Sequence, residues 1–381
     1  MEEFSQMNLI LIIAIAVTLL TSVYIVGRWG NMTCEGSMPV SPFAFYAILF
    51  TSGLDVGLIM FPLTEFPVYE QDPAYSFTNP LAVEFGFWGF LVWAFYFLTT
   101  FYFCVVEPRV KLFEIPVIRY INNLVVIATC AFTGYLFLSY LPTYITGISA
   151  FFQYALVGIV VLFAVLSSSD VKYVKILSVS STWLFFLLIA GMGLMSGMGI
   201  SGLTENLIEL GDYFSNIHRF VSPITDTHSF YLFWWFAWSV MIGQFVSRFL
   251  GSQKVWQLLI ALLIIPSIPI AAWFSVLYYY HVNAIEISEM IKICMVIVGI
   301  IFVINSLDSL IRLYTVNMKL TTDRIGRRYY VLGNWATMFG LILLYQFTPF
   351  KIEWVGLIVI GIYMAVYVLL VARRNLLKFS Q

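Results

Sequence analysis

Three tryptophans lie within five residues of an apolar stretch, FYLFWWFAWSVMIG, at 230–243. On a helix Phe230, Trp234 and Trp238 recur every fourth residue, so their rings share one face, and Trp235 lies beside it. Interfacial tryptophans collect at the ends of a membrane span, whereas these lie inside a predicted span. Aromatic packing between helices is the plain alternative. The pattern predicts a pocket lined by rings.

A second aromatic group opens another apolar run, FGFWGFLVWAFYF, where Trp88, Trp93 and Tyr96 are predicted to share one side of a helix. An aromatic belt at a membrane surface would look similar. With the first group, these rings predict a box with two walls. Such boxes hold quaternary ammonium groups through cation–π attraction, which contributes ~0.5–2 kcal/mol per ring.

A carboxylate, Asp55, lies at the centre of the run SGLDVGLIMFP, among Gly53, Gly57 and Pro62. The run predicts a discontinuous membrane helix whose freed backbone groups face a cavity. A charge at mid-membrane costs at least ~2.5 kcal/mol and is usually functional. Asp55 is therefore predicted to balance a cationic substrate, carry a proton or bind a coupling cation. Pairing with Lys292, or capping of the broken helix, is the structural alternative.

Polar residues also cluster in the run FVINSLDS, which contains Asn305, Ser306, Asp308 and Ser309. Hydroxyl and carbonyl oxygens suit hard cations such as sodium, so this run is a candidate cation site. Asp308 and Arg312 are spaced i, i+4, which is also the spacing of a structural ion pair.

Composition defines the class of protein. The 381 residues are 61% hydrophobic and 10% charged, with mean hydropathy +0.93, and this indicates an integral membrane protein. A net charge of −1 gives no sign of nucleic-acid binding. The cysteines lack metal-ligand spacing and the histidines form no metalloenzyme pair, so neither an enzyme nor a resident cofactor is predicted.

The predicted fold is all-α and polytopic, with apolar runs of sufficient length at about 7–27, 42–65, 84–106, 120–142, 147–167, 175–198, 228–250, 255–280, 286–317, 330–348 and 351–372. Basic residues set the orientation. All of the 19 except Arg219, Lys292 and Lys351 fall on one side, which is therefore cytoplasmic. The N-terminus is then outside, in a cell membrane, and residues 200–227 form an outer amphipathic helix.

The motifs resemble those of the betaine/choline/carnitine transporters. SGLDVGLIMFPLTEF is similar to the family's A-G-M-G-I-G-L…A-E-P, FYLFWWFAWSVMIGQFVSRFLG to W-W-x-x-W-S-P-F-V-G-x-F-x-A-R, and FVINSLDS to F-V-T-S-A-D-S. The ELGDYF and VWQLLIALLIIPSIPIAAWFSV stretches also match. The resemblance runs from about residue 28 to 372, and the tryptophan signature is its most specific part.

The resemblance implies a LeuT-like five-plus-five inverted repeat. Residues 1–41 form an extra N-terminal helix, 42–199 the first repeat, and 228–381 the second, with the outer helix between them. It places the substrate box on Trp88, Trp93, Tyr96, Phe230, Trp234, Trp235 and Trp238. It places a sodium site on the carbonyls of Thr51, Leu54 and Phe302 and the side chains of Asn305 and Ser306. A homotrimer follows by family analogy alone.

Departures from the family pattern shape the functional prediction. Asp55 replaces a glycine, and Asn305 replaces a threonine at the sodium site, so coupling to Na+ or to H+ stays open. Because an ionised Asp55 repels a substrate carboxylate, a choline-like cation is favoured. The alternatives are a sodium-coupled or exchange carrier of glycine betaine or carnitine, and a non-transporting sensor of a quaternary amine.

Overall fold

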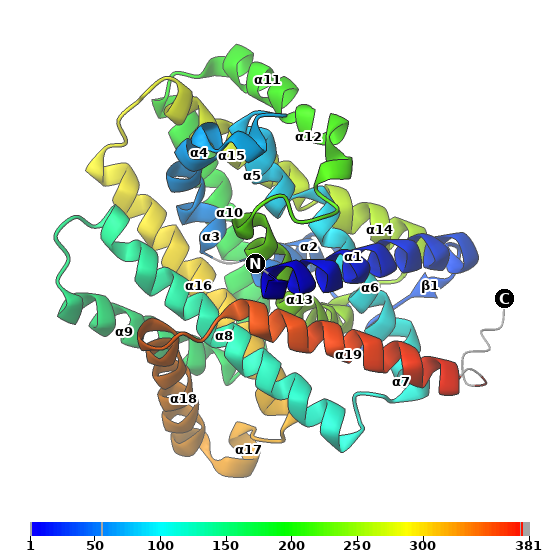
Figure 1. Cartoon of the computed structure of the whole chain (residues 1–381). Helices are drawn as coiled ribbons and strands as arrows, with labels where there is room; N and C mark the ends of the chain where they lie inside the picture. The colour runs from blue at the N-terminus through cyan, green and yellow to red at the C-terminus, as the bar shows by residue number, and fades with distance from the viewer. Residues whose placement is uncertain (1, 55, 374, 376–381) are drawn as a thin grey trace.

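The computed structural model describes residues 2–54, 56–373 and 375, and in this part of the chain the fold is a bundle of helices with one short β-ribbon (Figure 1). The ribbon pairs β1 (Thr33–Cys34) with β2 (Gln253–Lys254) in antiparallel fashion. It joins the loop after the first helix to the loop after the tryptophan-rich helix. The predicted all-α class is therefore confirmed apart from this two-residue pairing.

The first half of the chain contains α1 (Glu2–Trp29), α2 (Pro42–Gly53), α3 (Gly57–Met60), α4 (Pro62–Gln71), η1 (Pro73–Tyr75), α5 (Pro80–Trp88), η2 (Phe90–Val92), α6 (Trp93–Phe101), η3 (Tyr102–Val106), α7 (Glu107–Val110), α8 (Pro116–Tyr144), α9 (Ala150–Ser168) and α10 (Lys172–Met195). The second half contains α11 (Gly199–Leu210), α12 (Asp212–Ser215), η4 (Ile217–Arg219), α13 (Asp226–Val246), η5 (Ser247–Phe249), α14 (Val255–Ile264), α15 (Ser267–Val282), α16 (Glu289–Asn317), α17 (Thr322–Ile325), α18 (Arg327–Phe347) and α19 (Ile352–Ala372).

Nine helical segments of the described chain are long and apolar enough to cross a membrane. The sequence predicts eleven spans, and the two others are also helical but are shorter or less apolar. The predicted span 42–65 is divided among α2, α3 and α4. The predicted span 330–348 forms α18, which is 21 residues long but begins with two arginines. The polytopic membrane prediction is confirmed, while the five-plus-five repeat stays a prediction.

The third predicted span differs from the expected continuous helix. Helix α5 ends at Trp88, and the next residue, Gly89, has an extended backbone at φ −104° and ψ 173°. Phe90 follows with a left-handed φ of 40°, and a regular helix resumes only at Trp93. The sequence pattern predicted that Trp88 and Trp93 share one helix face. That prediction is wrong, because the two residues lie on different helices. A glycine before the turn allows this change of direction without a side chain in the way.

The outer segment also differs from a single helix, because α11 ends at Leu210 and α12 begins at Asp212. The face that packs inward carries Asn206, Leu210 and Tyr213, whereas Leu207 is 42% exposed. These elements cap one end of the bundle, with α17 and α18 toward the opposite end (Figure 1).

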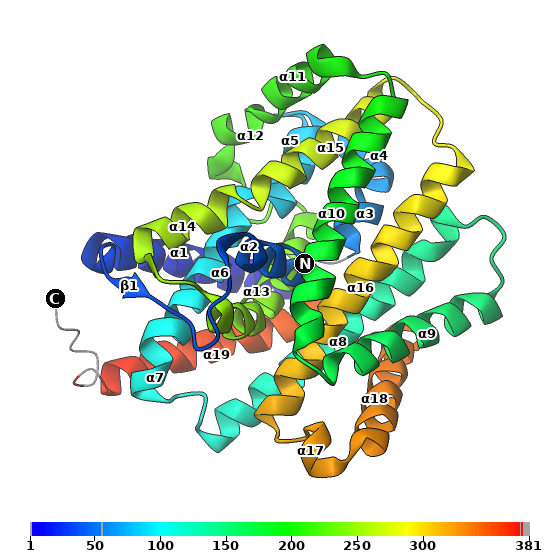
Figure 2. The ribbon, with the colours of Figure 1, turned by 180° about the vertical axis from the view of Figure 1, so that it is seen from behind.

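Helix α13 lies at the centre of the bundle. In its most apolar stretch 89% of the residues are buried, compared with 28% in that of α19 and 33% in that of α1. It packs against α19, α6 and α2. Helix α16 also contacts α13 and packs against α8, α9 and α10 (Figure 2). The tryptophan-rich stretch is thus surrounded by protein, which explains why it can be aromatic on every face.

Candidate functional site

The break after α2 is the feature on which the candidate site is built. Leu54 takes an extended backbone, with φ −124° and ψ 158°, and helix resumes at Gly57. Carbonyls at such a break lose their helical partners and need others. The Tyr96 hydroxyl, from α6, donates to the Gly53 carbonyl at 2.9 Å. The Ser306 hydroxyl, from α16, donates to the Leu54 carbonyl at 2.9 Å.

Two more side chains donate hydrogen bonds to backbone carbonyls that follow the break. Pro62 has no N–H, so the carbonyl of Leu58, four residues earlier, lacks its helical donor. The Trp273 indole donates to that carbonyl at 2.8 Å, and the Tyr144 hydroxyl donates to the Met60 carbonyl at 2.8 Å. The predicted discontinuous helix is therefore present. Side chains of α6, α8, α15 and α16 all donate hydrogen bonds to its backbone carbonyls. Sequence reasoning missed Trp273 and Tyr144, although Pro62 signalled an unpaired carbonyl nearby.

Five predicted box residues form one contiguous group, here called the ring cluster: Trp88, Trp93, Tyr96, Trp234 and Trp235. Ring centroids lie 5.3 Å apart for Trp88 and Trp234, and 5.7 Å apart for Trp88 and Trp235. Those of Trp93 and Tyr96 lie 5.2 Å apart, and those of Tyr96 and Trp235 lie 5.7 Å apart. Most pairs meet edge to face, which is favourable for aromatic quadrupoles. The cluster adjoins the break, because Tyr96 also bonds Gly53.

The other two predicted box residues are placed differently. Phe230 lies at the edge, with its ring 5.8 Å from that of Trp234, and it is only partly buried. Trp238 is buried, but among the described residues it makes no ring contact, and its indole N–H has no hydrogen-bond partner. Trp238 lies one helical turn after Trp234 on α13, but the helical periodicity could not locate the rings of other helices.

Rings that the sequence analysis did not include also border the cluster. Phe61 precedes Pro62, and its ring lies 6.1 Å from that of Trp88 and 6.2 Å from that of Trp234. It stacks on Tyr140 of α8 at 4.2 Å. Phe61 stands inside the break motif, which was the available signal, whereas nothing near Tyr140 in the sequence distinguishes it.

The interrupted helix α5–α6 fixes two indoles of the cluster. Trp93 Nε1 donates to the Trp88 carbonyl at 3.0 Å, and Trp235 Nε1 donates to the Phe87 carbonyl at 2.6 Å. These carbonyls are free to accept because α5 stops at Trp88. The same interruption that breaks the expected helix therefore orients the rings.

The ring cluster is closed in this structure. Its most exposed member, Trp235, is 4% exposed. Solvent barely reaches the rings, so a trimethylammonium group fits only after they separate. A cavity of about 300 Å³ lies elsewhere, among α1, α6, α13 and α19, and none of the predicted box residues lines it.

The predicted cation-site residues converge in part. Ser306 Oγ is 3.4 Å from the Thr51 carbonyl as well as bonded to that of Leu54. Phe302 lies one turn before Ser306 on α16 and is fully buried. Asn305 points to a different helix, where its amide nitrogen donates to Ser181 Oγ at 3.3 Å. The oxygens of Thr51, Leu54 and Ser306 suit a hard cation, whereas the Asn305 side chain is engaged with α10.

Asp55 lies outside the described residues. Its candidate partner Lys292 bonds Glu289 at 2.8 Å. Asp308 and Arg312 do form the ion pair that their spacing allows, at 3.0 Å, with the Asp308 side chain fully buried. Arg312 also donates to the carbonyl of Asp170 in the turn between α9 and α10, so this pair is structural.

Comparison with known proteins finds sequence relatives that are transporters. No family model matches it. It is 24% identical over 290 residues to the glycine betaine transporter OpuD of Bacillus subtilis, a match that covers 65% of this chain and 56% of the relative. It is 25% identical over 134 residues to glycine betaine transporter 1 of Vibrio parahaemolyticus, over 32% of this chain and 25% of the relative. The chain thus spans little more than half the length of the first relative.

The chain is therefore a distant homologue of glycine betaine transporters, and the resemblance to the betaine/choline/carnitine transporters is confirmed. These relatives are transporters rather than enzymes. The fold is also similar to that of a Na+-coupled sialic acid symporter solved in a substrate-bound outward-open state. That similarity has 16% identity, a TM-score of 0.38, and coverage of 98% of this chain and 83% of the other.

Proposed function

We propose that the protein is a secondary transporter of small quaternary ammonium compounds that works by alternating access in a cell membrane. The observation that supports this most directly is the hydrogen bond between Tyr96 of the ring cluster and Gly53 at the helix break. Movement at the break would therefore alter the hydrogen bond that holds the Tyr96 ring in place. A site that closes over a cation and is tied to a broken helix has the parts that alternating access requires.

The headgroup is bound by the ring cluster after its rings separate. Cation–π attraction selects a methylated ammonium group, which is too large to be hydrated tightly. A choline-like cation is the first candidate, because Asp55 at the break would repel a substrate carboxylate while ionised. Glycine betaine is the second candidate, and the names of the two sequence relatives favour it.

Coupling to sodium is supported by the carbonyl oxygens of Thr51 and Leu54, which lie 3.4 Å and 2.9 Å from the Ser306 hydroxyl oxygen of α16. A cation there would withdraw Ser306 from its bond to Leu54 and so link ion binding to the break. Proton coupling through Asp55 is the alternative. In the proposed orientation the N-terminus is outside and the C-terminus is cytoplasmic.

Uptake into proteoliposomes tests the proposal. Labelled choline and labelled glycine betaine are supplied in parallel, under an imposed sodium gradient or an imposed proton gradient. Accumulation of either compound above the level of protein-free liposomes is expected, and the gradient that drives it identifies the coupling ion. Specific binding of both compounds without accumulation under any gradient would instead identify a sensor.

A further inference from the structure

Two acidic side chains of the membrane region are packed together near the ring cluster. Glu65 lies on α4 and Glu84 on α5, two helices that contact each other. Glu84 is 0% exposed, and among the described residues neither acid forms an ion pair with Lys, Arg or His. Neither residue was selected by the sequence analysis as a site residue.

Glu65 has the environment of an ionised carboxylate. Its Oε2 accepts one hydrogen bond from the Tyr69 hydroxyl at 2.6 Å and another from the Tyr231 hydroxyl at 2.7 Å. Each tyrosine has a single hydroxyl hydrogen, and both are committed to Glu65. Hydrogen bonds to a carboxylate oxygen stabilise its charged form.

Glu84 has the opposite environment. Both of its carboxyl oxygens are buried, and no described group donates a hydrogen bond to either. Its carboxyl group lies beside that of Glu65 and near the Tyr69 hydroxyl and the Trp88 indole, but neither carboxyl oxygen has a hydrogen-bond partner among the described residues. A buried carboxylate without a donor is costly, whereas a protonated carboxyl group can donate to its neighbour.

We propose that Glu65 and Glu84 form a proton-binding site in which a single proton is shared by the two carboxyl groups and resides on Glu84 in this conformation. Two adjacent carboxylates repel each other strongly when one is fully buried, as Glu84 is, and the other partly buried, as Glu65 is, so one proton is retained. Its transfer breaks no heavy-atom bond, because the proton moves from the Glu84 oxygen to water or to Glu65. The site is distinct from Asp55 and does not depend on the proposed substrate.

The other titratable groups around the pair do not supply a balancing charge. They are the hydroxyls of Tyr69, Tyr75, Tyr140 and Tyr231. Burial raises the pKa of Tyr75, which lies outside the spans, so that hydroxyl stays neutral. On α15, the helix that packs against α4 and α5, His281 pairs instead with the exposed Glu70 at 3.2 Å. On α13, His228 stacks on Phe87, and its Nδ1 accepts from the Ile224 N–H.

The pair of Glu65 and Glu84 lies close to the ring cluster. Tyr231, which donates to Glu65, has its ring 5.6 Å from Trp88 and 5.8 Å from Trp234. Trp88 is one helical turn after Glu84 on α5. One layer of aromatic rings therefore separates the acid pair from the place where a cation is proposed to bind, and a proton at one site affects charge at the other.

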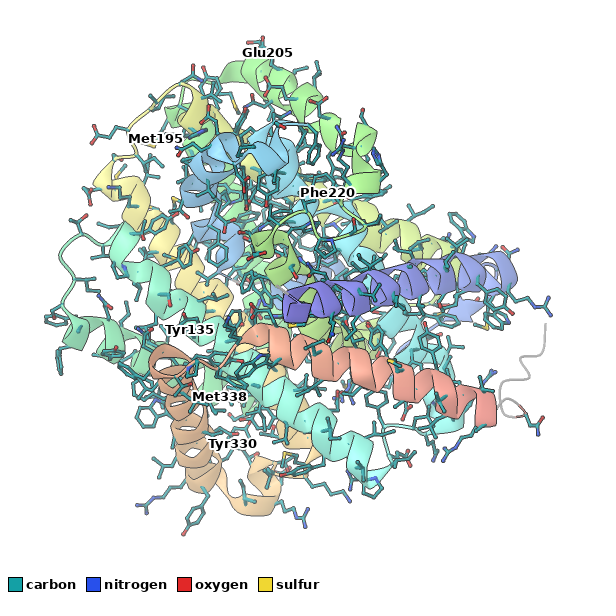
Figure 3. The ribbon with its side chains drawn as sticks, viewed as in Figure 1. Tyr135, Met195, Glu205, Phe220, Tyr330 and Met338 are labelled. Atoms are coloured by element: carbon teal, nitrogen blue, oxygen red, sulfur yellow. The ribbon has the colours of Figure 1, made fainter. Side chains whose placement is uncertain are left out.

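Infrared spectroscopy of the purified full chain in detergent tests the proton site directly. The C=O band of a protonated carboxyl group is recorded as a difference between wild type and Glu84→Gln at neutral pH. We expect a band that is present in wild type, shifts in D2O, and is lost in Glu84→Gln. Glu205→Gln is the matched control, since Glu205 lies at the outer edge of α11, away from α4 and α5 (Figure 3). It should leave the band unchanged.

A second variant guards against a folding defect in Glu84→Gln. In Glu65→Gln the acceptor facing Glu84 becomes an amide, so the Glu84 band should persist at a shifted frequency. The proposal is overturned if wild type and Glu84→Gln, both eluting as folded protein, show the same carboxyl bands. It is equally overturned if the Glu65→Gln spectrum is identical to that of wild type.

Discussion

The hydroxyl of Ser306 donates to the carbonyl of Leu54 at 2.9 Å, which joins the middle of α16 to the break after α2 across 252 residues of sequence. Both groups are fully or almost fully buried. A hydroxyl that completes a broken helix in one state can bind an ion in another, because the hydroxyl and the carbonyl both offer oxygens. This contact therefore connects the proposed coupling site with the element proposed to move.

Replacing Ser306 by alanine tests that connection. If transport is sodium-coupled, we expect Ser306→Ala to raise the sodium concentration for half-maximal uptake about tenfold, which corresponds to ~1.4 kcal/mol for one lost oxygen ligand. Ser309→Ala is the matched control, because its hydroxyl is equally buried on α16 but pairs with Ser52. An equal change in sodium dependence for the two variants would contradict a role specific to Ser306.

Removing rings should weaken substrate binding. We expect Trp93→Leu and Trp234→Leu each to raise Kd for choline or glycine betaine by about 2- to 30-fold, the equivalent of ~0.5–2 kcal/mol of cation–π attraction. Trp183→Leu is the control, because Trp183 is 55% exposed on α10. Titration calorimetry measures each Kd. Unchanged affinity in both ring variants would exclude the cluster as the headgroup site.

A methyl group at Gly53, the last residue of α2, should disturb the ring cluster. A Cβ at this position would be 3.1 Å from a Tyr96 ring atom and 3.4 Å from one of Trp93. Overpacking of this kind costs ~1–3 kcal/mol. We expect Gly53→Ala to lower the thermal unfolding temperature and weaken substrate binding together, whereas Gly333→Ala, inside α18 and with nothing within 4 Å, should do neither.

The buried pair of Asp308 and Arg312 should matter for stability rather than for binding. Arg312→Met leaves the fully buried Asp308 carboxylate without its partner, a change that costs ~3–5 kcal/mol. Thermal unfolding in detergent measures the loss. The double variant Asp308→Leu/Arg312→Met should recover part of it, since no buried charge remains. A double variant less stable than Arg312→Met would contradict this assignment.

The acid pair predicts a pH effect with a defined sign. Loss of the shared proton leaves the pair of Glu65 and Glu84 with one more negative charge, which attracts a cation at the ring cluster. Choline affinity should therefore rise as pH rises through the titration of the pair. Glu84→Gln should flatten this dependence, and Glu205→Gln should preserve it. A wild-type affinity that falls with rising pH would contradict the predicted sign.

Much of the fold follows from the sequence, because a membrane span is a local property of about 20 apolar residues. The break after Gly53 was predictable for a similar reason, since glycine and proline act through their own backbone geometry. The interruption between Trp88 and Trp93 was not predicted. Gly89 supplied the only local signal, and a single glycine inside an apolar run is also compatible with a continuous helix.

The partners of the break could not be read from the sequence. Trp273 and Tyr144 bond carbonyls far away in the chain, and helix packing alone determines which aromatic reaches them. Asn305 shows the same limit. Its polar type indicated a cation site, yet its side chain faces the serines of α10, because the adjacent residues Asn305 and Ser306 point about 100° apart around the helix.

Solute counterflow tests the central claim most directly, because it requires binding and translocation but no coupling gradient. Proteoliposomes are loaded with unlabelled choline or glycine betaine and diluted into the same labelled compound. The account predicts transient accumulation of label for at least one of the two, strongly reduced in Trp93→Leu and preserved in Trp183→Leu. No accumulation of either compound by folded wild-type protein, or full accumulation by Trp93→Leu, would contradict it.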